Sequence, residues 1–217
     1  PELTIAIDPL VPTGPLINSL RALSETFPNL PVHFSTEGLG GSLRRLRDGS
    51  AAFALCLLLP GVPEDIAAYP LLRVSMRAVV SPGHPLALLG RPATEGDLAP
   101  HIQLVLSDPV DPGGASYGLA GTRHWRFVDL GRRFDFLLAG FGWCRMPEHL
   151  VATSIVAEAL TAIEIHDDPT PPEGLKIYAA HRRDRALGVA GRWLRDELRR
   201  FEEEDLDNNR CVIEQSD

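Results

Sequence analysis

The amino-acid sequence predicts an α/β fold with a parallel sheet, divided into two lobes. Residues 3–59 follow the order strand, helix, strand, helix, strand, which is typical of a parallel sheet. The run 51–59 is almost wholly apolar, as expected for a strand covered on both faces. A second set of strands and helices begins near residue 75, without internal repeats. Two α/β lobes therefore fit better than one large sheet, with chain crossings near residues 74 and 181.

The first strand and helix are marked by apolar spacing and by proline. Residues 3–7 read as a strand, and residues 8–12 break it. Thr13 is predicted to be the N-cap of the first helix. Pro28 ends that helix. Its buried face carries apolar residues at helical spacing, namely Leu16, Leu20, Leu23 and Phe27.

The rest of the first lobe alternates in the same way. Residues 31–36 form the second predicted strand, and a glycine-rich turn follows at 37–41. The next helix covers residues 42–48 and closes on Gly49, which is well placed as its C′ residue. The apolar run 51–59 is the third strand.

The second lobe opens with a strand at 78–80. Thr94 is predicted to cap a short helix through residue 98, and residues 102–106 form another strand. Residues 107–121 are rich in Asp, Pro and Gly and read as an irregular loop.

The remaining elements follow the same reasoning. Asp129 is predicted to cap a helix running to residue 138, residues 140–146 form a glycine-led strand, and Pro147 starts the next helix. A strand at 175–181 precedes a long closing helix. One face of that helix carries Leu187, Ala190, Leu194, Leu198 and Phe201.

Charge and hydropathy exclude several function classes. The net charge of −8 is concentrated in residues 202–217, where seven acidic residues accompany one Arg. The body is near neutral and has no dense basic cluster, so we do not expect this segment to bind nucleic acid. No apolar run approaches the roughly 20 residues that span a bilayer. The chain starts with neither Met nor a secretory signal, and we therefore expect that an upstream piece of the protein is absent from this sequence.

The sequence carries no specific catalytic, cofactor or metal motif. The segment Gly40-Gly41-Ser42-Leu43-Arg44 lacks the second glycine of a nucleophile elbow. The seven histidines are scattered without metal-ligand spacing, and most are expected at the surface or at strand edges. No catalytic residue, metal ligand or cofactor is therefore predicted. The three cysteines fit a reduced setting better than a disulfide framework; they are Cys56, Cys144 and Cys211.

Two features could still contact a ligand. Asp8 follows the first strand and should face the crevice at the carboxyl ends of the parallel strands, where α/β sheets bind ligands. Phe141 and Trp143 flank a glycine, so core packing and a pocket role both stay open for them. The other aromatic side chains are most simply core or interface residues, namely Trp125, Phe127, Phe134 and Phe136.

An ordered set of motifs resembles a known family. The strand around Pro70-Leu71-Leu72, the turn Ser81-Pro82-Gly83-His84-Pro85-Leu86-Ala87 and the segment Gly140 to Pro147 occur in that order. Together with the first-lobe pattern they resemble the effector-binding domain of LysR-type transcriptional regulators, over residues 1–205. The resemblance implies a two-lobed type 2 periplasmic-binding-protein-like fold with an effector cleft between the lobes.

The same resemblance implies the organisation of the whole protein. Lobe I would comprise residues 1–74 and 182–205, lobe II residues 75–181, and residues 206–217 an acidic, disordered tail. An N-terminal winged helix-turn-helix domain would be missing from this chain and would make all DNA contacts. The regulator would be cytoplasmic, would assemble as a homodimer or homotetramer, and would bind a small-molecule effector.

Carried across by position, the resemblance places effector-binding residues in both lobes. Lobe I would contribute, besides Asp8, the residues Val11, Pro12, Thr13, Gly38, Leu39 and Leu57. Lobe II would contribute Leu106, Ser107 and Asp108, with Phe141 nearby. Thr13 offers the only hydroxyl of the first loop, and two of these residues are leucines, so the sequence does not predict a carboxylate effector.

Two other functions stay open at this point. An exported solute-binding protein of a transport system would share the fold, and its native form would be recovered from the periplasm. An enzyme on the same scaffold is the weaker alternative, because no nucleophile and base pair or metal set is evident.

Overall fold

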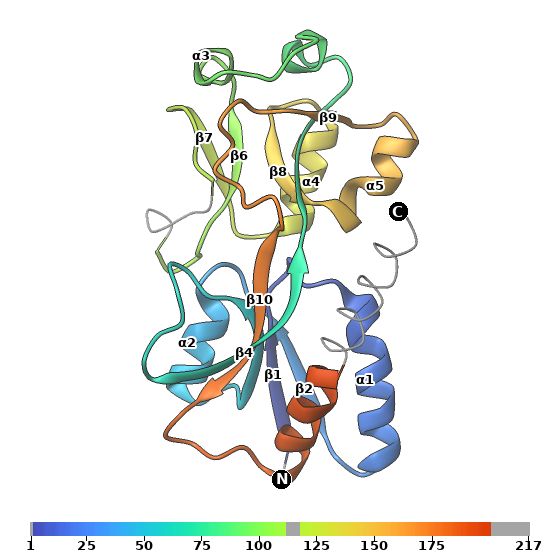
Figure 1. Cartoon of the computed structure of the whole chain (residues 1–217), viewed down its shortest axis with the longest axis vertical. Coiled ribbons are helices and arrows are strands. Elements are labelled where there is room, and N and C mark those ends of the chain that lie inside the picture. Colours follow the sequence, from blue (N-terminus) through green and yellow to red (C-terminus); the bar gives the residue numbers. More distant parts are fainter. Residues whose placement is uncertain (1, 112–117, 201–217) are drawn as a thin grey trace, which may run out of the picture. The chain divides into compact units, whose positions relative to one another are not determined.

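The computed structural model describes residues 2–111 and 118–200 of the 217-residue chain. The chain forms two compact units. The described part of unit 1 comprises residues 2–73 and 176–200, and that of unit 2 comprises residues 74–111 and 118–175 (Figure 1). The acidic segment 206–217 and residues 201–205 lie outside the described residues.

Unit 1 contains a mixed sheet whose strand order is β2-β1-β3-β10-β4. Its strands are β1 (Leu3–Ile7), β2 (Val32–Thr36), β3 (Phe53–Leu57), β4 (Ile66–Val74) and β10 (Leu175–Arg182). β1 pairs in parallel with β2 and with β3, whereas β10 is antiparallel to β3. The carboxyl ends of β1, β2 and β3 therefore share one edge.

The helices of unit 1 are α1 (Thr13–Thr26), α2 (Gly41–Asp48) and the helical residues 189–200. The predicted cap at Thr13 is wrong: the N-cap is Pro12, in an extended conformation and without a side-chain bond. Thr13 is the first helical residue. Gly49 ends α2 as predicted, with φ of 80° and its N–H donating to the carbonyl of Leu46.

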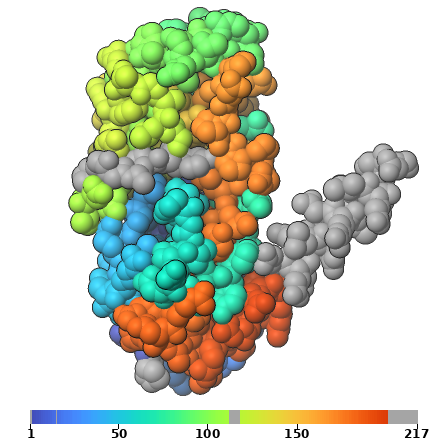
Figure 2. Space-filling view, turned by 60° about the vertical axis from the view of Figure 1, so that its left-hand side comes forward, coloured from blue at the N-terminus to red at the C-terminus, as the bar shows by residue number. Residues whose placement is uncertain are grey.

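Part of the core of unit 1 lies between α2 and the sheet, and side chains of α1 and of the helical residues 189–200 are buried as well, namely Leu16, Leu23, Leu194 and Leu198. Small and branched side chains fill the part next to α2, which lets this helix approach the strands closely. The buried cluster comprises Ala6, Leu46, Ala51, Ala54, Cys56, Leu58, Ile66 and Ala180. On the surface of unit 1, the segments of α2, β4 and residues 182–188 lie side by side (Figure 2).

Unit 2 has two further sheets, one of three strands in the order β8-β5-β9 and one of two strands, β6 and β7. Its strands are β5 (Met76–Val80), β6 (Gln103–Leu106), β7 (His124–Phe127), β8 (Cys144–Pro147) and β9 (Thr161–Ile163). β5 lies between β8 and β9 and is antiparallel to both, while β6 and β7 pair in parallel. A parallel bridge between Gln103 and Trp143 links β6 to the segment that leads into β8.

The helices of unit 2 connect these strands. They are a 3₁₀ helix, η1 (Pro85–Leu88), and the α-helices α3 (Glu95–Leu98), α4 (Leu130–Leu138) and α5 (Glu148–Val156). The caps predicted at Thr94 and Asp129 are confirmed, since each side chain accepts a bond from a backbone N–H of its first turn. Pro147 precedes α5 as its N-cap rather than starting it.

The strand predicted at 140–146 is shorter and later, at residues 144–147. Gly142 explains the difference. A β-carbon at this position would overlap the carbonyl oxygen of Ile102. The backbone here passes directly against the neighbouring segment, and only a single bridge forms before regular pairing begins.

Candidate functional site

At the carboxyl edge of the parallel strands in unit 1, Asp8 lies directly after β1. Its side chain is only 3% exposed, and its Oδ1 accepts a bond of 2.9 Å from the N–H of Leu10. The backbone at Asp8 is anchored by donation of its N–H to the carbonyl of Leu55 and by acceptance from the N–H of Val11. The carboxylate is thus held in a fixed position at the end of the strand.

Burial makes Asp8 electrostatically unusual. Loss of water around the carboxyl raises its pKa to about 6, although backbone N–H groups of Leu10 and Leu57 partly offset this effect. No cation is paired with Asp8 among the interactions of the described residues. A buried carboxyl that titrates near neutrality at a ligand-binding edge is a candidate functional group.

The other predicted residues of unit 1 follow the ends of the same strands, but they differ in accessibility. Val11 is buried, Pro12 is half-buried and Thr13 is exposed. The turn after β2 carries half-buried Gly38 and Leu39, and half-buried Leu57 ends β3; the turn is tied to β1 by donation of the Glu37 N–H to the carbonyl of Ile7. The predicted residues of this edge therefore supply one carboxyl, one hydroxyl and an apolar surface.

In unit 2, the carboxyl end of β6 carries the predicted residues Leu106, Ser107 and Asp108. Leu106 and Ser107 are buried and Asp108 is half-buried. Both the N–H and the Oγ of Ser107 donate to the carbonyl of Phe127, at 2.8 and 3.3 Å. The Asp108 carboxylate accepts bonds from backbone N–H groups of its own turn, so it shapes this loop.

Phe141 does not lie with these residues. It precedes the bridge between Gln103 and Trp143, and so it lies toward the amino ends of β6 and β8. Its ring is 47% exposed and packs against Trp125 and Phe136, with centroid distances of 5.5 and 5.0 Å. Trp125 itself is 41% exposed, so these aromatic rings form a surface cluster rather than core.

Arg133, which the sequence reasoning did not single out, lies at the carboxyl edge of unit 2. It is on α4, and its Nη2 donates to the carbonyl of Arg145 and contacts the sulfur of Met146, at 3.2 and 3.0 Å. The parallel register of Gln103 with Trp143 places Met146 level with Leu106. The helical spacing of this segment could have indicated that Arg133 is buried, because Leu130, Arg133 and Leu137 share the buried face of α4.

A second buried guanidinium in unit 2 has a clear structural role. The Nη2 of Arg145 lies 3.1 Å from the Asp168 carboxylate, the side chain also donates to the carbonyl of Gly118, and it covers the ring of Trp143. Although burial opposes ionisation of Asp168, the Thr170 bonds and the Arg145 charge outweigh it and lower the pKa of that carboxyl. Arg145 therefore has a counter-charge in Asp168, although its Nη2 makes no hydrogen bond.

A cavity of about 140 Å³ opens in unit 1 at the opposite edge of the sheet. It lies near the amino ends of β1 and β3 and is lined by Glu2, Ala51, Ala52, Arg182, Arg185, Ala186, Leu187 and Gly188. Because parallel sheets bind ligands at their carboxyl ends, we do not assign the effector to it.

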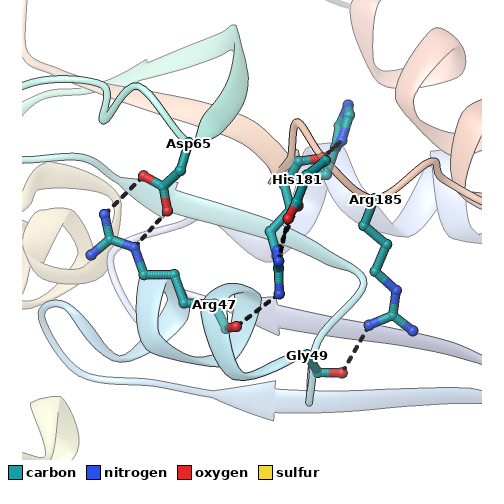
Figure 3. Close-up of polar contacts among 7 residues, drawn as sticks. Arg47, Gly49, Asp65, His181 and Arg185 are labelled. Carbon is teal, nitrogen blue, oxygen red and sulfur yellow. Dashed lines mark hydrogen bonds and ion pairs between the residues drawn. The ribbon is translucent and has the colours of Figure 1, made fainter.

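The arginines of this cavity stabilise the end of a helix (Figure 3). Arg182 donates to the carbonyl of Arg47 and Arg185 donates to the carbonyl of Gly49, so both arginines bind acceptors at the carboxyl end of α2. Arg47 in turn forms a two-bond ion pair with Asp65, at 2.8 and 2.9 Å. These contacts join the first and last segments of unit 1.

Metal and thiol chemistry gain no support from the described ranges. Within them, no group of three or more His, Cys, Asp or Glu side chains could hold a metal ion. Burial raises the pKa of Cys56 to about 12 and that of Cys144 to about 11, so both thiols stay protonated near neutral pH. His84 is an exception to the expected surface histidines, because it is buried and its Nδ1 accepts a hydrogen bond from the N–H of Leu86.

No helix in residues 2–111 and 118–200 is long and apolar enough to cross a membrane.

Solved structures share this fold over almost the whole chain. The effector-binding domain of QuiR in complex with shikimate aligns with a TM-score of 0.70 at 15% identity, covering 94% of this chain and 98% of that one. The regulatory domain of MetR, a LysR family regulator from N. meningitidis, aligns with a TM-score of 0.67 at 17% identity, covering 94% of each chain.

The effector-binding domain of BenM with benzoate aligns with a TM-score of 0.64 at 18% identity, covering 94% of this chain and 93% of that one. At these identities the likeness establishes the fold, and it confirms the predicted two-lobed periplasmic-binding-protein-like architecture. Comparison with curated protein sequences found no significant match.

Sequence comparison with protein families gives one assignment. The family model described as the LysR substrate binding domain matches residues 1–202, which is nearly the whole chain. The resemblance drawn from the motifs is thereby confirmed. The chain belongs to the LysR substrate-binding domain family.

Proposed function

We propose that this chain binds a small-molecule effector at the carboxyl ends of its parallel strands and thereby controls DNA binding by a LysR-type regulator. Membership of the LysR substrate-binding domain family makes it a ligand-sensing regulatory domain. The observation that carries the location of the site is Asp8, a buried carboxyl fixed at the end of β1 with its pKa raised to about 6.

The chemistry of the carboxyl edge of unit 1 supports a small polar molecule. This edge offers a carboxyl at Asp8 beside apolar Val11 and Leu57. Such a mixture of apolar surface and few fixed polar groups is typical of small-molecule sites. The effector-binding domains of QuiR and BenM share the fold and bind the small molecules shikimate and benzoate, respectively.

The regulatory step follows from differential binding. An effector that binds one arrangement of the domain more tightly shifts the population toward it, by no more than that difference in affinity allows. We further propose that a separate winged helix-turn-helix domain of the regulator contacts DNA. The regulator self-associates as a dimer or tetramer and is cytoplasmic.

The rival functions receive no support from the comparisons. The family and fold matches are to domains of transcriptional regulators, and no observation indicates turnover. Export as a solute-binding protein is likewise not favoured by the family match.

The proposal predicts that blocking the edge of unit 1 abolishes effector binding. Leu57→Arg places a long charged side chain at the half-buried end of β3, whereas Leu88→Arg makes the same change on η1, where the leucine is exposed. A metabolite panel is first screened for compounds that raise the melting temperature of the 217-residue chain. We expect each hit to lose affinity at least about tenfold in Leu57→Arg and to be unchanged in Leu88→Arg.

Two results would contradict the proposal. One is a panel in which no compound shifts melting of the chain or promoter occupancy by the full-length regulator. The other is a set of hits that bind Leu57→Arg as tightly as the parent chain. Circular dichroism of both variants checks that each is folded.

A further inference from the structure

We propose that residues 81–88 of unit 2 form a pH-sensitive turn, which is closed while the imidazole of His84 is neutral and opens when that ring takes up a proton. The turn contains the Pro-Gly-His-Pro-Leu sequence of residues 82–86, which the proposed effector site does not use. Acidification therefore loosens unit 2 at this turn.

His84 closes the turn through its side chain and its backbone. It is the N-cap of η1, and its Nδ1 accepts a hydrogen bond of 3.2 Å from the N–H of Leu86. Its N–H donates to the carbonyl of Ser81, and its carbonyl accepts from the N–H of Ala87. These bonds hold Leu86, which is 3% exposed, in a buried cluster with Val80, Ala93, Leu98 and Trp143.

Protonation of His84 is incompatible with this cap. A ring nitrogen that accepts a hydrogen bond carries no proton, so the single proton of the neutral ring is on Nε2. The next proton can enter only at Nδ1, where the Leu86 N–H already points. Two donors would then face each other, and the Leu86 N–H would lose its acceptor in the protein interior. The charged ring therefore opens the turn.

The surroundings of His84 also oppose a positive charge. The residue is only 7% exposed, so a cation there would be poorly hydrated. Its ring packs edge to face on that of His101, with centroids 4.6 Å apart, and His101 becomes cationic in acid as well. Burial first and His101 second lower the pKa of His84 below its ordinary value of 6.5.

Neighbouring side chains do not compensate for the proton. The segments around the turn are residues 89–102, residues 119–124 and β9 with the residues after it. Their titratable side chains, besides His101, are Arg91, Glu95, Asp97, Arg123, His124, Glu164, His166, Asp167 and Asp168. Among the described residues, His101 is the only one whose charge acts on His84. Asp97, the carboxylate of α3, is engaged by Arg91.

The direction of the pH dependence follows from the lowered pKa. The closed turn binds a proton less readily than the open turn, so closure is fully favoured above pH 6.5 and weakens as the pH falls through the lowered pKa of His84. Asp8 in unit 1 has the opposite sign, because its raised pKa makes the protonated form stabilising in acid. His149 on α5 acts in the same direction as His84. Unfolding of the whole chain would mix these effects, so the test needs a local reporter.

The first test follows the Leu86 N–H by amide hydrogen exchange of the 217-residue chain at pH 7.5 and pH 5. Each rate is divided by the intrinsic exchange rate at that pH. We expect protection of the Leu86 N–H to fall at least about fivefold, and that of the Ala139 N–H at the end of α4 to change less than about twofold. Constant protection of Leu86, or an equal loss at Ala139, would overturn the proposal.

The second test identifies the protonated nitrogen. Long-range ¹H–¹⁵N NMR spectra of the histidine rings distinguish a proton on Nε2 from one on Nδ1. At pH 7.5 we expect His84 to carry its proton on Nε2, and on acidification to titrate at a lower pH than exposed His33. A proton on Nδ1 at pH 7.5 would show that His84 is not the cap, and the proposal would fail.

The third test uses matched variants. His84→Asn keeps a neutral acceptor at the N-cap but cannot titrate, His101→Phe keeps the ring without its charge, and His33→Asn is an exposed control in unit 1. We expect Leu86 protection to become independent of pH in His84→Asn and to follow the parent chain in His33→Asn. In His101→Phe the titration midpoint of His84 should rise.

Two results with these variants would refute the proposal. One is a folded His84→Asn chain in which Leu86 protection still falls in acid as in the parent. The other concerns a His84→Asn chain that does not protect Leu86 even at pH 7.5. His101→Phe then decides, and an unchanged titration midpoint of His84 counts against the proposal.

Discussion

Asp8 shows how one residue can couple folding to proton uptake. Its pKa is raised from 3.8 to about 6 in the folded chain, so the folded state binds a proton that the unfolded state has released between about pH 4 and pH 6. Stability conferred by the protonated form is therefore present at low pH and is lost as the pH rises through 6.

Replacing this residue by its neutral counterpart should remove that pH dependence. We expect Asp8→Asn to be more stable than the parent chain by about 1–3 kcal/mol at pH 7 and to lose this advantage near pH 4. Urea unfolding from pH 4 to 8 measures the difference. A constant difference across this range would show that Asp8 does not titrate in it. Asp135→Asn, at an exposed carboxyl on α4, is the matched control.

At the scale of elements, the backbone at Gly142 passes closest to a neighbouring segment, at Ile102, among the described glycines. A methyl group at Gly142 would overlap the carbonyl of Ile102, whereas one at Gly83 would meet no atom within 4 Å. We expect Gly142→Ala to lower the free energy of unfolding by about 2 kcal/mol or more, and Gly83→Ala to be nearly neutral. Equal effects in urea unfolding would mean that the backbone relaxes without cost.

The same elements show what sequence can predict. The caps at Thr94, Asp129 and Gly49 depend on side chains and glycine within one turn, and the sequence signals are correct there. Thr13 was misassigned because Pro12 already supplies the extended residue before α1. Whether a helix or strand forms depends on the local spacing of apolar residues. Its exact first and last residues depend on the residues and segments next to it.

The candidate site was predictable only in outline. The ends of β1, β3 and β6 follow from strand order, which places Asp8, Leu57 and Ser107 at carboxyl edges. Phe141 lies elsewhere because the bridge at Trp143 sets the register of β8. Arg133 was missed because a charged residue on a helix is normally solvated, and its burial depends on packing against β8.

At the scale of the whole molecule, the described part of each unit contains one buried thiol that can report the opening of that unit. Cys56 is in the core of unit 1 and Cys144 is in β8 of unit 2, and both have raised pKa values. In a Cys211→Ser chain, we expect an aromatic disulfide reagent at pH 8 to leave both thiols unmodified in native buffer. Both should react in concentrated guanidinium chloride.

Site-resolved mass spectrometry after labelling distinguishes the two thiols. Rapid modification of either one in native buffer would show that its unit opens readily without denaturant. Similar protection of both would indicate that the two units are comparably stable.

The two ends of unit 2 meet at one point of the chain. A β-carbon on Gly174 would lie 2.7 Å from the carbonyl oxygen of Val74, so the residue that enters unit 2 touches the one that leaves it. In the sheet of unit 1, β4 and β10 are neighbours. Unit 2 is thus inserted between two neighbouring strands of unit 1, β4 and β10. A short turn in place of unit 2 would join these strands directly. Unit 1 could then be expressed by itself, and unit 2 could be exchanged for that of a relative.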